Sequence, residues 1–328
     1  MSAVLTVFSP AKVNLHLAIG PRRTDGYHEA CSVMHALTLH DTVTVRYEQD
    51  ARGCDSSIEV RCATHGGVAP LDIPAEDNIA FKAIDRLLDA YGLHAGGHRF
   101  VVHIDKHIPH AAGLGGGSSN AAAALAAACR ILNIDANDDR VAQVARSLGA
   151  DVPFFLRGGC AVLGDRGDVF ERALGPMKAP VVLVRPEEGV STAAAYAAFD
   201  ADPTYATEED EQRLAAVDSA CDVPFFNNLA AASERIVPEL ATVRSWLGEQ
   251  PGVARDERTG AARVLLSGSG SATMCVCESM DAAYAIVAAA KRQGWWARSC
   301  SFSSAGARII ERARGGVRTN VGAVHKSW

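Results

Sequence analysis

Residues 109–125 read PHAAGLGGGSSNAAAAL and contain the sharpest local feature of the sequence. It follows a run, 99–108, whose apolar residues alternate as they do in a strand. It leads into an alanine-rich segment, 119–132, with high helix propensity. Glycine permits positive φ and lets the backbone approach a ligand closely. Successive backbone N–H groups can then form an anion-binding concavity, to which a helix N-terminus adds its positive end. The segment 113–119 therefore predicts a phosphate-binding turn.

The turn matches neither of two common nucleotide-binding patterns. A P-loop ends in Gly-Lys-[Ser/Thr], whereas Gly117 is followed by Ser118. Gly113 and Gly115 fit the dinucleotide fingerprint, but its last glycine is replaced by Ser118. The alternative is a flexible connector with a helix cap. Three consecutive glycines between regular elements are costly in chain entropy, which favours a ligand role. Ser118 and Ser119 can donate to phosphate oxygens or reach a metal.

Polar side chains precede the turn. Lys106 and His110 lie close to it, and Lys106 either compensates phosphate charge or is a solvated surface lysine. His103, Asp105 and His107 alternate along the same run and resemble a metal cluster. Because a strand rises about 3.3 Å per residue, His103 and His107 lie roughly 13 Å apart, and we expect no metal site there.

Hydrophobic periodicity further out predicts two α+β units with a boundary near residue 175. The expected strands are 13–19, 41–47, 99–108, 181–184, 263–266 and 273–277. The expected helices are 78–91, 119–132, 138–148, 191–199, 210–216, 229–247 and 282–293. Pro153 disfavours α geometry at Val152, so we expect residues 151–153 to leave the helical region.

The composition is that of an ordinary globular protein: 328 residues, 48% hydrophobic and 21% charged, enough for about two domains. The net charge of -6 offers no basic field for nucleic acid or anionic lipid, so an anionic ligand needs a local site. The nine cysteines include no Cys-x-x-Cys pair, which favours free thiols in a reducing cytosol. We see no signal peptide and no apolar run of about 18 residues, and therefore expect a cytoplasmic protein without a membrane segment.

Three segments together resemble one superfamily: PAKVNLHLAIGPRRTDGYHEACSVMHALTLHD at 10–41, the glycine turn, and LLSGSGSA at 265–272. This is the galactokinase, homoserine kinase, mevalonate kinase and phosphomevalonate kinase (GHMP) superfamily. Within it, Lys12-Val13-Asn14-Leu15, the Asp-Gly-Tyr-His segment at 25–28 and LGADVPFF at 148–155 resemble the 4-diphosphocytidyl-2-C-methyl-D-erythritol kinase family. The resemblance spans about residues 5–310 in the family's order.

The resemblance implies an α+β fold with an N-terminal ribosomal-S5-like domain at 1–175, a C-terminal ferredoxin-like GHMP domain at 176–312, and a flexible tail at 313–328. It implies transfer of the ATP γ-phosphoryl group to the 2-hydroxyl of 4-diphosphocytidyl-2-C-methyl-D-erythritol, in the non-mevalonate route to isoprenoid precursors. Mg²⁺ is expected with ATP because it neutralises the phosphates, and no side chain is assigned as its ligand. We expect a monomer or weak homodimer.

The resemblance also implies roles for individual residues. Asp151 corresponds to the catalytic base and Lys12 to the lysine that orients it and stabilises negative charge. Tyr27 and His28 correspond to the cytosine-recognition pair. The other expected substrate contacts are Asn14, Ser191, Thr192 and Tyr196. The expected nucleotide contacts are Asn78 on the adenine side, Lys106, Pro109, His110, Ala111, Ala112, Gly113, Leu114, Gly115, Gly116, Gly117, Ser118 and Ser119.

Several alternatives stay open at this stage. Asp151 taken alone fits a helix-end cap, and 268–271 fits a tight turn as well as a buttress of the site. The Pro109–Ala112 approach departs from the family pattern, and we assign no role to the segment 53–67. Another GHMP kinase, acting on homoserine or a mevalonate-type alcohol, is one rival, against which the Asp-Gly-Tyr-His segment argues. A non-catalytic GHMP-fold ligand-binding protein is another, against which the presence of Lys12 and Asp151 argues.

Overall fold

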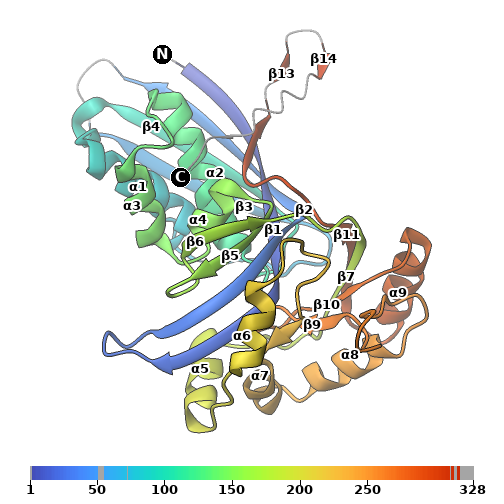
Figure 1. Ribbon diagram of the computed structural model, residues 1–328. Helices are drawn as coiled ribbons and strands as arrows, with labels where there is room; N and C mark the ends of the chain where they lie inside the picture. Colours follow the sequence, from blue (N-terminus) through green and yellow to red (C-terminus); the bar gives the residue numbers. More distant parts are fainter. Residues whose placement is uncertain (1, 51–54, 72, 311, 314–315, 318–328) are drawn as a thin grey trace.

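The computed structural model describes residues 2–50, 55–71, 73–310, 312–313 and 316–317 (Figure 1). Most of the tail predicted at 313–328 therefore lies outside the described residues. The first two residues of the segment 53–67 lie outside them as well. The remainder of that segment contains a strand, β3 (Ser57–Thr64), which pairs in parallel with β4 (His98–Lys106). This segment, to which we assigned no role, thus extends a sheet.

The first sheet is built on a long antiparallel pair, β1 (Ser2–Arg22) and β2 (His28–Gln49). The strands predicted at 13–19 and 41–47 are parts of these longer elements. The sheet has eight strands, with the order β12-β1-β2-β4-β3. In this order β12 is Arg308–Ile310, and the three remaining members are β5 (Cys160–Gly164), β6 (Val169–Leu174) and β8 (Phe226–Asn227). One register shift precedes Lys12 and another follows Asn14, and such bulges re-aim side chains.

Helices α1 (Ile79–Tyr91), α2 (Gly116–Leu132), α3 (Asp139–Leu148) and α4 (Val152–Arg157) gather on one face of this sheet (Figure 1). The alanine-rich α2 lies at the centre, because small side chains let it approach both the strands and its neighbouring helices. Short 3₁₀ turns, η1 (Ala75–Asp77) and η2 (His94–Gly96), flank α1. The apolar faces of these helices and of β1, β2 and β4 form one continuous core.

The second sheet has the order β11-β7-β10-β9, with β7 (Pro180–Arg185), β9 (Val264–Leu266), β10 (Thr273–Val276) and β11 (Trp296–Ser301). Helices α8 (Glu239–Gly248) and α9 (Met280–Arg292) pack against it in a separate apolar cluster. Helices α5 (Thr192–Ala201) and α7 (Ala230–Ile236) instead pack against Leu17 and Ile19 of β1. The remaining elements are α6 (Glu208–Ala215) and the two short strands β13 (Arg312–Ala313) and β14 (Gly316–Val317). The predicted α+β class is confirmed, and the division near residue 175 stays a prediction.

Two local expectations were wrong, and proline explains both. The single helix expected at 229–247 is two helices, because Pro238 cannot continue a helix and instead begins α8 as its N-cap. Val152, which we expected outside the helical region, is the first residue of α4, and Pro153 is the second. Proline is tolerated there, since the first amides of a helix need no intrahelical acceptor.

The buried His35 of β2 makes the fold sensitive to acid. Its Nδ1 lies 3.0 Å from the carbonyl oxygen of Ala36, and its Nε2 accepts from the backbone N–H of Met177 at 3.0 Å. This pattern fits only a neutral imidazole with the hydrogen on Nδ1. Burial lowers the pKa of His35 to about 4.

We expect stability to fall as the pH drops from about 6.5 to 4, since the unfolded chain then binds a proton that the folded chain excludes. The loss is about 3 kcal/mol for this one group. Urea unfolding between pH 7.5 and 4 measures it. The His35→Gln variant keeps a donor and an acceptor but cannot titrate, so its profile should be flatter. An equally steep profile in that variant would contradict the assignment.

Candidate active site

The glycine turn is closely packed on its inner side. Gly115 has φ +68 and is the N-cap of α2, which begins at Gly116, earlier than the expected residue 119. A Cβ at Gly115 would lie 2.6 Å from the Phe155 ring and 3.1 Å from Cγ of Lys12. A Cβ at Gly113, where φ is +72, would collide with the carbonyl oxygen of Ser267. These glycines are therefore required by close approach, and the turn is not a loose connector.

The start of α2 has no side-chain cap. The N–H groups of its first turn accordingly lack a partner of the usual N-capping kind. Ser119 does not supply one, because its hydroxyl is fully buried and accepts from Ser9 at 2.8 Å. Ser118 is half-buried. The helix N-terminus thus offers backbone donors and its positive end to an anion.

Lys12 and Asp151 lie directly beside this turn. The Lys12 ammonium is 3.6 Å from Oδ2 of Asp151 and donates to Oδ1 of Asn14 at 2.7 Å. The backbone N–H of Lys12 donates to the carbonyl of Leu114, which ties β1 to the turn. Asp151 is the N-cap of α4, yet its side chain makes no capping hydrogen bond. The Asp151 carboxylate therefore does not cap the helix. Its side chain is 26% exposed to solvent and lies near the Lys12 ammonium.

The segment 265–272 supports the turn from below. The Ser267 hydroxyl donates to the carbonyl of Gly113 at 2.9 Å. The backbone N–H of Ala272 donates to the carbonyl of Ala112 at 3.0 Å. The segment also links β9 to β10, so it is both a tight connection and a buttress. Ala112 and Leu114 are buried, and their carbonyls are used inside the protein.

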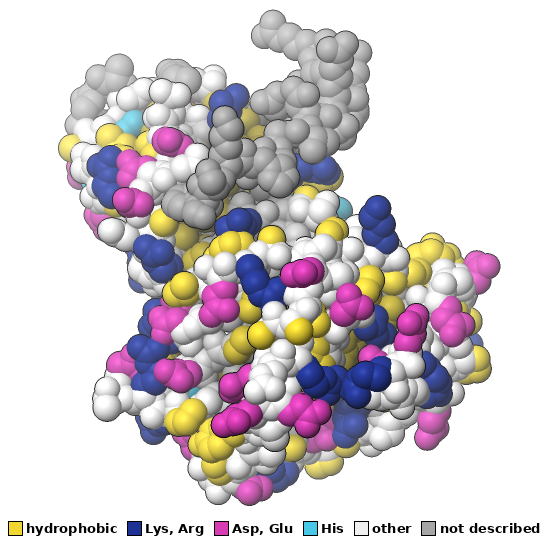
Figure 2. Space-filling view, in the orientation of Figure 1, with side chains coloured by type: hydrophobic (Ala, Val, Ile, Leu, Met, Phe, Trp, Pro, Cys, Tyr) yellow, Lys and Arg dark blue, Asp and Glu magenta, His cyan; other side chains and the backbone are white. Residues whose placement is uncertain are grey.

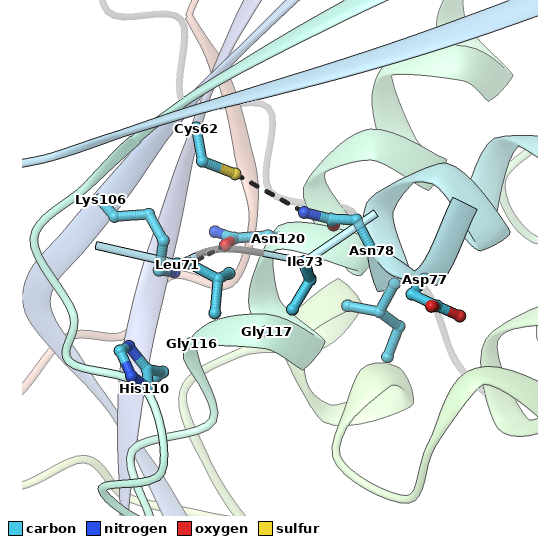
Figure 3. Close-up of a pocket in the computed structure, with 11 residues that line it drawn as sticks. Cys62, Leu71, Ile73, Asp77, Asn78, Lys106, His110, Gly116, Gly117 and Asn120 are labelled. Atoms are coloured by element: carbon cyan, nitrogen blue, oxygen red, sulfur yellow. Dashed lines mark hydrogen bonds between the residues drawn. The ribbon is translucent and has the colours of Figure 1, made fainter. Parts of the chain in front are cut away.

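A cavity of about 180 Å³ opens on the outer side of the turn (Figure 3). It brings together several of the predicted nucleotide contacts. Its lining residues are Cys62, Leu71, Ile73, Asp77, Asn78, Ile79, Lys106, His110, Gly116, Gly117 and Asn120. Asn78 also caps α1 by accepting from the N–H of Ala80. Pro109, Ala111 and Ala112 do not line this cavity.

Lys106 is not the solvated surface lysine that the sequence left open. Its ammonium is buried and donates to Oδ2 of Asp41 at 2.6 Å and to Oδ1 of Asn120 at 2.9 Å. Asp41 is fully buried and also accepts from the N–H groups of His107 and Ile108. Sequence reasoning missed Asp41 and Asn120, because their pairing joins β2, β4 and α2 across long chain separations.

Positive charge gathers locally on one side of the turn. Arg185 donates to the carbonyls of His110, Pro186 and Glu187 and forms no ion pair with a described carboxylate. Burial, and then the charges of Arg185 and Lys106, lower the pKa of His110. Elsewhere the charges are mixed: Figure 2 shows basic and acidic side chains interspersed over the face in view. An anion would therefore be drawn to this site rather than to a basic surface.

The predicted substrate contacts gather on the other side of Asp151. Tyr196 of α5 is close enough that burial and then the Asp151 charge raise the pKa of Tyr196 to about 12. Its ring centroid lies 5.1 Å from that of His28. Tyr27 is 57% exposed, with the Arg166 guanidinium 4.8 Å from its ring centroid.

The start of α5 supplies the two remaining contacts that the sequence predicted. Thr192 Oγ1 lies 3.0 Å from Oγ of Ser269, which joins α5 to the segment 265–272. The Ser191 hydroxyl accepts from the N–H of Ala194 and so caps α5. Both side chains therefore have partners within the protein. Ser191 contacts the start of α5, and Thr192 contacts the segment 265–272.

The relationship to known proteins follows from three comparisons. The family model described as "GHMP kinases N terminal domain" matches residues 78–159. A protein of Desulfitobacterium hafniense (strain Y51) named 4-diphosphocytidyl-2-C-methyl-D-erythritol kinase is 33% identical over 286 residues, 86% of this chain and 90% of that protein. The chain belongs to the 4-diphosphocytidyl-2-C-methyl-D-erythritol kinase family. A second family member, from Nocardia farcinica (strain IFM 10152), is 35% identical over 320 residues, 93% of this chain and 96% of that protein.

A solved structure of a 4-diphosphocytidyl-2-C-methyl-D-erythritol kinase has the same fold. The crystal structure of 4-(cytidine 5'-diphospho)-2C-methyl-D-erythritol kinase matches with a TM-score of 0.66 at 31% identity, over 92% of this chain and 99% of that chain. Mevalonate kinase of L. major, at 17% identity and a TM-score of 0.65, shares the fold alone. The GHMP kinase architecture implied by the resemblance is confirmed, and membership of a kinase family implies ATP as the phosphoryl donor.

The residues of the turn fit the phosphates of ATP. A Cβ at Gly116 would lie 2.9 Å from Cγ2 of Ile108 and 3.6 Å from Nζ of Lys106, so this position has no room for a side chain. No group of three His, Cys, Asp or Glu side chains in the described part of the chain could hold a metal ion. His103 and His65 each contact the Asp105 carboxylate. Within the described ranges, no helix is long and apolar enough to cross a bilayer.

Proposed function

We propose that this chain transfers the γ-phosphoryl group of ATP to the 2-hydroxyl of 4-diphosphocytidyl-2-C-methyl-D-erythritol, giving the 2-phosphate and ADP. The Lys12–Asp151 pair, 3.6 Å apart beside the uncapped start of α2, carries the proposal. A coupled assay tests it, and the expected result is ADP formation that depends on the cytidylyl alcohol. Phosphorylation of mevalonate or homoserine instead would assign the chain to a different GHMP activity.

Asp151 is proposed as the group that receives the hydroxyl proton. Its carboxylate is partly exposed, carries no capping bond and can accept a hydrogen bond from an alcohol. As the new O–P bond forms, the alcohol proton becomes acidic and passes to the carboxylate, while the bond to the departing ADP oxygen breaks. Asn14 holds the Lys12 ammonium in place through their hydrogen bond of 2.7 Å. Lys12, 3.6 Å from the Asp151 carboxylate, orients it and stabilises charge on the attacking oxygen.

The phosphates of ATP are proposed to lie on the backbone N–H groups at the start of α2. The cavity of about 180 Å³ on that side, with Asn78 and Lys106 in its wall, suits the rest of the nucleotide. When bound, Mg²⁺ would supply charge neutralisation of the phosphates, and no described side chain is assigned as its ligand. This chain's own residues orient the reactants and keep both in line for transfer.

The Lys12→Met variant is expected to lower kcat by about 10²-fold, because the transition state loses a preorganised cation. Lys12 is only 4% exposed and methionine can fill its channel, so thermal unfolding should change little. Steady-state kinetics with saturating ATP measure the effect. Lys82→Met, at an exposed lysine paired only with Asp77 on the surface, is the matched control. A twofold effect in Lys12→Met would remove Lys12 from the mechanism.

We also propose a cytoplasmic location and function as a monomer or weak homodimer. The eight cysteines in the described part of the chain are all unpaired, which suits a reducing compartment. Sedimentation of the purified chain tests the oligomeric state, and a stable higher oligomer would contradict this proposal.

A further inference from the structure

A histidine–carboxylate pair lies at the end of the site that is remote from the glycine turn. His28 begins β2, and Asp200 is in the last turn of α5. Nε2 of His28 lies 2.6 Å from Oδ1 of Asp200. This short separation makes it one of the closest polar contacts around the substrate side, and sequence reasoning gave Asp200 no role.

The His28 ring is held by its neighbours. Its side chain is 7% exposed. Tyr196 packs against it at a centroid distance of 5.1 Å, and the edge of Phe199 at 6.4 Å. Both neighbours are on α5, the helix that also carries Asp200. Since α5 contributes all three contacts, the ring cannot turn to exchange its two nitrogens without losing its carboxylate partner.

The carboxylate determines which nitrogen of His28 carries the hydrogen. An ionised carboxylate only accepts hydrogen bonds, so the nitrogen facing it must be an N–H donor. In the neutral imidazole the other nitrogen, Nδ1, is then a bare acceptor. No hydrogen bond joins Nδ1 of His28 to any residue among those described. His28, which follows the exposed Tyr27 in the sequence, therefore presents a fixed acceptor that has no hydrogen-bond partner among the described residues.

We propose that Asp200 is a specificity-determining residue that makes His28 select an aminopyrimidine over an oxopyrimidine base. The inference rests on the proposed function and on the role in base recognition that the resemblance implies for His28. Cytosine presents an exocyclic amine, a hydrogen-bond donor, where uracil presents a carbonyl oxygen, an acceptor. A bare Nδ1 accepts from the amine, whereas two lone pairs face each other in the uracil complex, which is the repulsive element that specificity requires.

The Asp200→Asn variant tests this inference, because an asparagine amide can donate to Nε2 as well as accept from it. His28 can then carry its hydrogen on Nδ1 and donate to a carbonyl. The assay compares kcat/KM for the cytidylyl alcohol and for its uridylyl analogue at about pH 8, where free histidine is neutral. In Asp200→Asn the ratio of kcat/KM for the cytidylyl alcohol to kcat/KM for the uridylyl analogue should fall about tenfold. We expect kcat/KM to fall for the cytidylyl substrate and to rise for the uridylyl substrate.

Two control variants separate specificity from a structural effect. Asp200→Glu keeps the carboxylate and should restore the preference. Asp202→Asn, at an exposed residue paired with Arg235 just after the same helix, should leave the ratio unchanged. Equal losses for both substrates in Asp200→Asn, or an unchanged ratio, would overturn the inference. If the wild-type chain phosphorylates neither substrate, the proposed function fails instead.

A direct measurement of the tautomer is independent of activity. Nitrogen NMR of histidine-labelled protein distinguishes a protonated from an unprotonated ring nitrogen, and a His28→Gln spectrum identifies the signals of this one among 11 histidines. We expect an unprotonated Nδ1 in the wild type and a mixture of tautomers in Asp200→Asn. A protonated Nδ1 in the neutral wild-type ring would overturn the inference even if the enzyme is active.

Discussion

The Asp151→Asn variant is expected to lose about 10³-fold in kcat with little change in either KM, because a positioned general base contributes about 10²–10⁴-fold. Asparagine has the shape of aspartate but cannot take the proton of the attacking alcohol. Asp151 makes no capping bond, so the substitution removes no interaction that α4 needs. The loss should appear in single-turnover experiments with saturating ATP and cytidylyl alcohol, where the chemical step is observed directly.

The matched control is Asp139→Asn, at an exposed aspartate in the first turn of α3. It makes the same chemical change near a helix start, away from Lys12, and should retain full turnover. Turnover in Asp151→Asn within a few-fold of wild type would show that the proton leaves by another route. Equal losses in both variants would indicate a general effect of surface charge.

The parts of the site that the sequence predicted are those fixed by local chemistry. Gly113 and Gly115 have positive φ in the structure, as glycine in a tight turn before a helix suggests. Lys12 and Asn14 could be placed on one side of β1 because side chains alternate along a strand. Their hydrogen bond of 2.7 Å agrees with that placement. Such features need only a few neighbouring residues to be recognised.

The parts that the sequence did not predict depend on pairing between distant segments. Asp41 and Lys106 are 65 residues apart, and His28 and Asp200 are 172 apart. Nothing in the neighbours of Asp41 marks it as a buried carboxylate. For the same reason the sequence did not predict the partner of Ser119. Its place in the glycine turn predicts a phosphate contact, but its hydroxyl contacts Ser9 in the core. These partners are determined by how β1 and β2 pack with β4, α2 and α5.

The buried pair of Asp41 and Lys106 leads to the largest expected effect on stability. In the Asp41→Ala variant, Lys106 keeps a buried ammonium with no carboxylate, and two backbone N–H groups lose their acceptor. Breaking a buried pair by removing one partner costs about 3–5 kcal/mol. Urea unfolding at pH 7.5 should show a loss of that size. The KM for ATP should also rise in the remaining folded protein, since Lys106 lies in the wall of the cavity beside α2.

A second substitution shows whether the loss arises from the stranded charge or from the missing acceptor. Replacing a whole buried pair by apolar groups is often nearly neutral, so Asp41→Ala combined with Lys106→Met should recover part of the stability. It should not recover the low KM for ATP, because the ammonium is gone. Asp202→Ala, which breaks the exposed pair with Arg235 outside the cavity, should change neither quantity measurably. If Asp41→Ala were as stable as Asp202→Ala, the network of β2, β4 and α2 would not hold the nucleotide side of the site together.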